Sequence, residues 1–192
     1  MNAVILNGAP AGGRGTVSRK VRDAVVCELQ SRGWAVKVFE LEALNIKPCR
    51  GCFACWLKHP GKCSIQDGGE AYLRALVASD AMVWITPVTF GGVSSILKRA
   101  LDRSIPILLP FFIKTHGEIH HPQRYEKRRK LLAVGTLPNH DARAEQIFRN
   151  LVQRNAINMN PLTTDICVLS EYATDAEMTS RVKNFIRTAG IK

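Results

Sequence analysis

The sequence predicts an α/β fold, a five-stranded parallel sheet with helices on both of its faces. Short, continuous apolar runs alternate along the chain with stretches whose apolar residues recur at helical spacing. Parallel strands buried on both faces are continuously apolar, and the helices that cover them are amphipathic. The 192 residues contain no internal repeat, low-complexity tract or linker, so we expect one domain over 1–192.

The expected strands are short apolar or β-branched runs bounded by turn residues. The first, AVILN, ends at a glycine-rich stretch, and the second, WAVKVFEL, alternates along its length. AMVWIT, KLLAVGT and TDICVLS are the other three. In chain order, the predicted strands cover 3–7, 34–41, 81–86, 130–136 and 164–170.

The expected helices carry apolar residues at every third or fourth position. In the first helix this stripe is Val17, Val21, Val25 and Leu29. Ser94 is the predicted N-cap of the third helix, and Thr174-x-x-Glu177 is a capping-box pattern at the start of the last. The helices are predicted over about 17–29, 70–79, 94–103 and 141–157, with a final one after Thr174.

Two connections, 42–69 and 104–129, are too long to be plain loops. Long structured connections in compact domains tend to be functional. The first contains a cysteine-rich segment at about 47–69. We therefore look for function in both.

The chain has a formal net charge of +11. Such a positive field attracts anions, which include nucleic acid, phosphorylated cofactors and acidic proteins. Much of the charge lies in 124–130, and we interpret this run as a solvated loop. No zinc-finger spacing or RNA-recognition aromatic pattern is present, so the sequence does not favour a nucleic-acid partner.

No run approaches the roughly 18 apolar residues of a membrane span, so we expect no membrane partner. The first residues lack the basic segment and cleavage site of a signal peptide. We therefore expect a cytoplasmic protein, in which thiols stay reduced. Clustered cysteines in that compartment more often bind metal or do redox chemistry than form structural disulfides.

The loop NGAPAGGRGT, residues 7–16, lies between the first strand and the first helix. Its backbone N–H groups and the helix N-terminus suit a phosphate. Gly8-x4-Gly13 has the spacing of a Walker A loop, but Arg14 and Gly15 replace its Lys and Ser or Thr. A turn without a ligand is the alternative.

Two stretches resemble the flavin loops of the flavodoxin-like NADPH-dependent FMN reductase family. ILNGAP…GT resembles the FMN phosphate loop, and TPVTFGGVSSILKRALDR, residues 86–103, resembles the second flavin loop. The cysteines lie between them, where the iron–sulfur flavoprotein branch of the family has its cluster motif. The resemblance implies a doubly wound sheet of order 2-1-3-4-5, with FMN at the switch point.

The resemblance also implies flavin contacts residue by residue. The phosphate would meet Asn7, Ala9, Gly13, Gly15 and Thr16, with Arg14 adding charge. The isoalloxazine ring would lie against Pro87, Val88, Thr89, Phe90 and Gly91. A third loop, 136–141, begins with Thr136 and Leu137 and would close over the ring. The chain departs from the family pattern at Ala9, Ala11, Gly15 and Thr89, where the family more often has Ser, Arg, Asn and Tyr.

The four clustered cysteines follow the spacing C-x2-C-x2-C-x7-C, at Cys49, Cys52, Cys55 and Cys63. A [4Fe–4S] cluster is one interpretation, because three closely spaced thiolates plus a fourth from a nearby turn are typical of ferredoxins. Lys47, Arg50, Lys58 and Lys62 would offset its negative charge. Zinc is the second, although such sites usually join two separated knuckles. Inert or disulfide-forming thiols are the third.

Other polar and sulfur-containing residues receive structural interpretations. Cys27 and Cys167 are expected to be buried small hydrophobes, Trp56 is expected to pack, and Asp102–Arg103 is expected to be an ion pair that ends a helix. His116, His120 and His121 belong, with Tyr125, to an expected arm that packs on a neighbouring subunit or covers the flavin. Metal binding by the paired histidines is the alternative, which no nearby Cys or carboxylate beyond Glu118 supports. We find no hydrolytic triad or carboxylate pair, so no catalytic residue is predicted.

These observations favour an FMN-dependent oxidoreductase that carries a [4Fe–4S] cluster. It would connect a one-electron donor, such as an acidic ferredoxin, to a two-electron acceptor, and we expect a homodimer or homotetramer. One alternative is an NAD(P)H-dependent FMN or quinone reductase without a cluster. Another is a basic, redox-sensing nucleic-acid-binding protein.

Overall fold

The computed structural model describes residues 1–12, 15–115 and 117–192. Its main sheet has five parallel strands in the order β2-β1-β3-β6-β7. They are β1 (Asn2–Asn7), β2 (Ala35–Glu40), β3 (Ala81–Pro87), β6 (Lys130–Leu137) and β7 (Thr164–Ser170). Since β6 and β7 are the fourth and fifth strands of this sheet, the predicted order 2-1-3-4-5 is confirmed.

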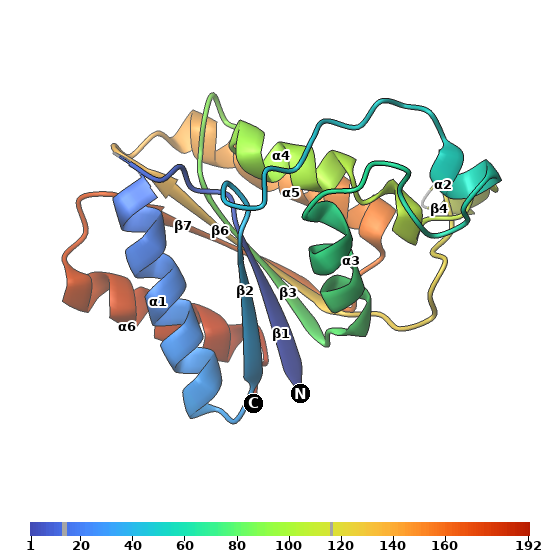
Figure 1. The fold of residues 1–192 in the computed structure, drawn as a ribbon. Coiled ribbons are helices and arrows are strands. Elements are labelled where there is room, and N and C mark those ends of the chain that lie inside the picture. The colour runs from blue at the N-terminus through green and yellow to red at the C-terminus, as the bar shows by residue number, and fades with distance from the viewer. Residues whose placement is uncertain (13–14, 116) are drawn as a thin grey trace.

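Helices cover both faces of the sheet, as Figure 1 shows. α1 (Gly15–Ser31) and α6 (Asp175–Thr188) lie on one face, and α3 (Gly69–Ala78), α4 (Ser95–Asp102) and α5 (Ala142–Met159) lie on the other. Consecutive residues of β3 point to opposite faces. Met82 and Trp84 pack towards α3, α4 and α5, whereas Val83 and Ile85 pack towards α1 and α6. All seven residues of β3 are buried, which explains its continuous apolar sequence.

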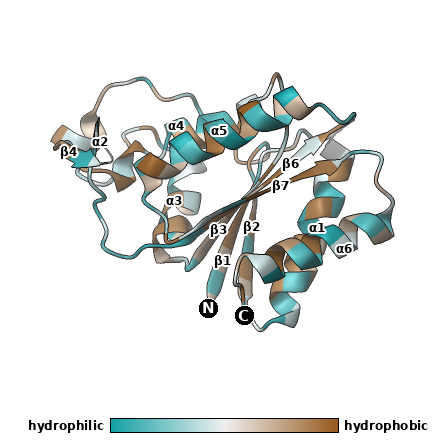
Figure 2. Cartoon of the chain, turned by 180° about the vertical axis from the view of Figure 1, so that it is seen from behind, coloured by the Kyte–Doolittle hydropathy of each residue, from teal (hydrophilic) through white to brown (hydrophobic). Residues whose placement is uncertain are grey.

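The helix starts follow the predicted capping chemistry. Ser94 accepts a hydrogen bond from the Leu97 N–H and caps α4. Thr174 and Glu177 form the complete capping box of α6. Brown apolar and teal polar residues alternate along the helices in Figure 2, as expected for amphipathic helices.

The two long connections contain secondary structure of their own and meet beside the sheet. The first contains the short helix α2 (Ala54–Leu57). The second contains the 3-10 turn η1 (Ile105–Ile107) and an antiparallel hairpin of β4 (Ile113–Thr115) and β5 (Glu118–His120). Trp56 joins them, because its indole N–H donates to the Leu108 carbonyl at 3.0 Å and its ring lies 4.7 Å from that of His121. The predicted packing role of Trp56 is confirmed.

Residues 125–128 are exposed, as the interpretation of 124–130 as a solvated loop expects, but the expectation that the run is unengaged is wrong. Arg124 donates to the carbonyls of Pro106 and Leu108, and Arg128 donates to those of Asn160 and Pro161. Lys127 forms an ion pair with Asp80 at 2.7 Å, and Arg129 is buried. Carbonyls at the ends of secondary-structure elements lack partners within those elements, and long cationic side chains supply the donors.

The expectation for Cys27 is also wrong, since its side chain is exposed. It lies two positions after Val25 on α1, which places it on the face opposite the buried stripe. Cys167 is partly buried, and burial raises the pKa of its thiol. Within the described ranges, no helix has the length and apolar content needed to cross a membrane.

Candidate functional site

Three loops gather at the carboxyl ends of β1, β3 and β6. From β1 the chain crosses to β2 on one side of the sheet, and β3 then lies on the other side of β1. This reversal is the switch point at which open parallel sheets bind ligands. The predicted flavin residues therefore belong to one edge of the sheet.

The first loop is held by the side chain of Asn7. Its amide Nδ2 donates to Glu40 at 2.8 Å, and its Oδ1 accepts the Ala9 N–H at 3.3 Å. Glu40 also pairs with Arg22 at 2.6 Å. Asn7 thus orders the loop through its side chain, and Ala9 follows it as a buried residue.

The first loop packs directly on the start of α4. Gly8 donates its N–H to the Ile85 carbonyl at 2.8 Å, and the Ser94 hydroxyl donates to the Gly8 carbonyl at 2.5 Å. A Cβ on Gly8 would lie 2.5 Å from the Cβ of Leu97. Only glycine allows this approach, so Gly8 is required for contact between the loop and α4.

Arg19 is a cation at this loop that the sequence analysis missed. It donates to the carbonyls of Pro10 and Ala11 and, at 3.1 Å, to the hydroxyl of Thr16. The position of an arginine inside an expected helix does not indicate that its side chain reaches back to the loop before the helix. The predicted phosphate contacts Gly13 and Arg14 lie outside the described residues, and Gly15 is the first residue of α1.

The second loop makes a tight turn after β3. Thr89 and Gly92 exchange backbone hydrogen bonds of 2.9 and 2.8 Å, and the two residues between them have positive φ, 50° at Phe90 and 76° at Gly91. This is the pattern of a two-residue type I′ turn. The Phe90 ring is fully exposed, whereas Pro87 and Val88 are buried. A ligand here would meet the backbone of the loop and the Phe90 ring.

The third loop is bonded to the second. The Val88 N–H donates to the Thr136 carbonyl at 2.9 Å. The Thr136 hydroxyl donates to Glu171 at 3.2 Å and lies 3.4 Å from that of Ser18 on α1. Thr136 and Leu137 are both buried, so they pack beneath the surface that a ligand at this edge would contact. The structure brings the described flavin-loop residues to one edge, but several point their side chains into the core.

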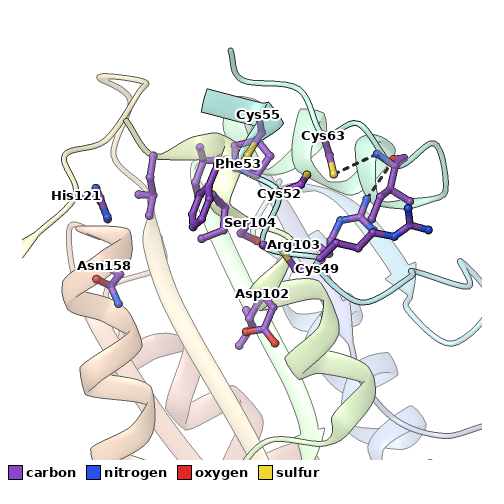
Figure 3. A pocket seen from close by; sticks show the side chains of 18 of the residues that line it. Cys49, Cys52, Phe53, Cys55, Cys63, Asp102, Arg103, Ser104, His121 and Asn158 are labelled. Carbon is purple, nitrogen blue, oxygen red and sulfur yellow. Dashed lines mark hydrogen bonds between the residues drawn. The ribbon is translucent and has the colours of Figure 1, made fainter. Parts of the chain in front are cut away.

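The four clustered cysteines line one pocket of about 560 Å³, which we call the cysteine pocket (Figure 3). Arg103, η1 and the end of α5 supply its other walls. Phe53 has a left-handed backbone, φ 51°, between Cys52 and α2, and this turns the chain between the second and third cysteines. Among the described residues, no group of three or more metal-binding side chains is at ligating distance. The thiols therefore face the same space without being closed around an ion.

The thiols influence one another electrostatically. Burial raises the pKa of the Cys55 thiol, and the sulfurs of Cys63, Cys49 and Cys52 raise it further. The pKa of the Cys52 thiol is lowered by the Ala54 N–H and then by the Ser64 hydroxyl, 3.6 Å away. A bound cation would relieve the repulsion among these sulfurs.

The predicted Asp102–Arg103 ion pair is wrong. Asp102 instead pairs with Lys98 on the surface of α4. Arg103 is buried and pairs with Asp67 through two contacts, at 2.9 and 3.1 Å. Asp102 is held one helical turn back by Lys98, whereas Arg103 follows the last residue of α4 and turns into the cysteine-rich connection.

Arg103 and Asp67 together close the cysteine-rich connection. Arg103 also donates to the carbonyls of Lys47 and Ile65, which lie on either side of the four cysteines. Asp67 accepts the N–H groups of Lys47, at 2.9 Å, and of Gly69, at 2.8 Å. Burial raises the pKa of Asp67, but the hydrogen bonds from Arg103, Lys47 and Gly69 outweigh this effect, so the pKa of Asp67 is lowered.

One side chain that lines the cysteine pocket carries an unpartnered donor. Among the described residues, the Nε–H of Arg103 is buried and has no hydrogen-bond partner. A buried unpaired donor is costly unless a ligand uses it. Four thiols with a buried guanidinium beside them fit an anionic metal–thiolate group. Lys47, Arg50, Lys58 and Lys62 are exposed and so supply weaker compensation than expected.

The histidines of the second connection bind their own chain. His120 contacts Asn158 on α5 at 2.9 Å and Glu118 at 3.1 Å, and Glu118 pairs with Arg154 of α5. His121 contacts the Phe111 carbonyl. The hairpin is therefore held against α5, while the predicted contact with a neighbouring subunit stays a prediction. His116 lies outside the described residues.

The fold and the two loop systems define a flavodoxin-like α/β protein with a cysteine pocket beside its ligand-binding edge. The chain matches the family NADPH-dependent FMN reductase over residues 1–173 and belongs to that family. The resemblance stated from the sequence is thereby confirmed.

Individual proteins are similar to the chain in sequence or in fold. The chain is 32% identical to iron-sulfur flavoprotein MJ1083 of Methanocaldococcus jannaschii over 114 residues, which is 59% of this chain and 57% of that protein. The chain thus spans little more than half the length of that relative. A solved NAD(P)H:quinone oxidoreductase from Methanothermobacter marburgensis has a TM-score of 0.70 at 15% identity, covering 98% and 97% of the two chains. An FMN-dependent NADH-azoreductase from Bacillus anthracis, solved with FMN, has a TM-score of 0.63 at 12% identity, covering 98% and 97%.

Proposed function

We propose that this protein is an FMN-dependent oxidoreductase that also binds a [4Fe–4S] cluster through Cys49, Cys52, Cys55 and Cys63. FMN exchanges one or two electrons and the cluster exchanges one, so together they would connect one-electron and two-electron partners. The observation that carries the proposal is the cysteine pocket, in which four thiols share one space with a buried, partly unpaired arginine. Family membership supports the flavin.

The residues at the switch point would bind and orient FMN. The N-terminus of α1, with Arg19 and Thr16, offers donors and positive charge to the phosphate. The turn Thr89–Gly92 offers its backbone and the exposed Phe90 ring to the flat ring system. A Cβ on Gly91 would lie 2.6 Å from Ile147, so the close packing of this turn on α5 fits a preformed site.

The protein's partners follow from its charge and its family. A surface of net charge +11 favours an acidic donor such as a ferredoxin, because complementary charge speeds association. NAD(P)H is a further donor, in keeping with the family name. We also propose a homodimer or homotetramer with a single domain in each chain.

An NAD(P)H-dependent quinone reductase without a cluster is the second candidate. Two observations favour it. No metal-ligating group is preformed among the described residues, and the fold is that of a solved quinone oxidoreductase. In this case the four thiols would be redox-inactive or would form disulfides.

Anaerobic purification followed by a UV–visible spectrum and iron, sulfide and flavin assays separates the two. The first proposal expects FMN with about four iron and four sulfide per chain. Cys55→Ser should lose the iron and keep the flavin, and Cys27→Ser, on an exposed face of α1, should keep both. Flavin without iron, combined with steady-state NADPH oxidation, would support the second candidate. Absence of both chromophores after FMN is added would contradict both.

A further inference from the structure

We propose that Arg103 is a positioning residue for the cysteine pocket, which donates its Nε–H to the sulfur of Cys63 and sets the charge balance around the bound metal group. The role rests on the proposed function, because it concerns the thiolates of Cys63 and its neighbours when they bind a cluster. Arg103 is not one of the predicted ligands, and sequence reasoning assigned it to a different ion pair.

Among the described residues, the hydrogen bonds of Arg103 leave its Nε as the guanidinium nitrogen without a partner. Nη1 donates to Asp67 and to the Lys47 carbonyl, and Nη2 donates to Asp67 and to the Ile65 carbonyl. The side chain is 1% exposed, so bulk solvent does not reach Nε. The unused donor therefore belongs to a residue whose other nitrogens are fixed by four bonds.

Cys63 is the candidate sulfur for this donor, because it lines the same pocket as Arg103 and lies two residues from Ile65, whose carbonyl accepts from Nη2. Burial opposes the charge of Arg103, but the hydrogen bonds of Asp67 and then the nearby sulfur of Cys63 outweigh it and raise the arginine pKa. Cys63 also accepts the Ile65 N–H at 3.5 Å. Ile65 and Cys63 belong to one loop segment, and Arg103 holds this segment. The donor and the sulfur are therefore fixed relative to each other.

The charge arrangement makes the role measurable. A hydrogen bond from a cation to a cluster sulfur stabilises the more negative, reduced state and raises the midpoint potential. Asp67 is a buried carboxylate on the same guanidinium, and it lowers the potential by partly neutralising that charge. The two residues should therefore act on the potential with opposite signs, although they act together in holding the loop.

The test compares three variants of the full-length protein, with the cluster reconstituted anaerobically. Arg103→Lys keeps a positive charge beside Asp67 but has no Nε–H. Asp67→Asn keeps Arg103 and most of its hydrogen bonds but removes the negative charge. Arg129→Lys is the matched control, because Arg129 is also buried with an unpaired Nε but does not line the cysteine pocket. The readouts are iron per chain and the midpoint potential of the cluster from a redox titration followed by EPR.

We expect a lower potential in Arg103→Lys, a higher one in Asp67→Asn and no change in Arg129→Lys. Shifts of the same sign in the first two, or none, would show that the pair only holds the loop and would overturn the proposal. A wild-type protein that takes up no iron would overturn the proposed cluster and this role with it.

A second measurement covers the case in which Asp67→Asn loses its iron. Cadmium ion alone is added to the metal-free wild-type protein, and arginine side-chain N–H signals are followed by NMR. The Arg103 Nε–H signal, identified by its absence in Arg103→Lys, should shift on cadmium binding while that of Arg129 stays in place. An unchanged Arg103 signal in the cadmium-loaded protein would overturn the proposal.

Discussion

Removal of the Asp67 carboxylate should destabilise the protein far more than removal of Asp102, although both aspartates pair with cations in α4 or at its C-terminal end. Asp67→Ala leaves the Arg103 guanidinium buried without its counter-ion and also removes the acceptor for two backbone N–H groups. Breaking a buried ion pair from one side costs about 3–5 kcal/mol. The pair Lys98–Asp102 is exposed and spans one helical turn, so Asp102→Ala should cost no more than about 0.5 kcal/mol.

The assay is urea unfolding of metal-free protein at pH 7, followed by circular dichroism, with both variants measured beside the wild type. A cost of about 3–5 kcal/mol is a large share of the roughly 5–15 kcal/mol that stabilises a typical domain. The urea concentration at the midpoint of unfolding should therefore fall clearly in Asp67→Ala. Equal costs for the two variants would refute the buried pair.

The same variant predicts a pH dependence. Asp67 has a lower pKa in the folded protein than in the unfolded chain, where a carboxyl of this type titrates near pH 4. Its stabilising contribution is thus complete above about pH 4 and is lost as the pH falls through the folded-state pKa. The difference in unfolding free energy between wild type and Asp67→Ala should be constant from neutral pH to about pH 5 and shrink below it.

Three further predictions concern the flavin edge and the thiols. Gly91→Ala should destabilise the fold and weaken FMN binding several-fold, because φ is positive and the new Cβ would collide with α5. Gly12→Ala is the control, because its new Cβ meets nothing within 4 Å. Equal FMN affinities of the two variants in a fluorescence titration would contradict this prediction. Ser94→Ala should cost about 1 kcal/mol through the lost helix cap and should also weaken FMN binding, since the hydroxyl holds the first loop; unchanged unfolding curves would contradict this. In metal-free, reduced protein, Cys52 should react with iodoacetamide faster than Cys55, because Cys52 is exposed and the pKa of its thiol is lowered. Peptide mass spectrometry measures the two rates, and the opposite order would contradict the pocket geometry.

The sheet and its helices were predictable because each depends on local periodicity. The β3 run is apolar throughout because both of its faces are buried, and Thr174 and Glu177 cap α6 through contacts three residues apart. The four cysteines were predictable for the same reason, because their spacing is short. Their shared pocket is consistent with that prediction, while the ligand set and the flavin contacts stay predictions.

The contacts that escaped prediction join residues distant in sequence. Arg103 and Asp67 are 36 residues apart, and no local pattern distinguishes this pairing from one with the adjacent Asp102. The basic run 124–130 looked solvated because its acceptors are carbonyls, which every residue has and no sequence reveals. Arg19 was overlooked because helical spacing does not show that a side chain turns back over the preceding loop.

Helix α4 joins the two candidate cofactor sites as a spacer of fixed length. At one end Ser94 bonds to the first flavin loop, and at the other Arg103 bonds to both arms of the cysteine-rich connection. Eight residues at a rise of 1.5 Å make a rod of about 12 Å. The path for electrons between flavin and cluster would then be set by two turns of helix. One inserted residue would lengthen it by about 1.5 Å and rotate Arg103 by about 100°, out of the cysteine pocket.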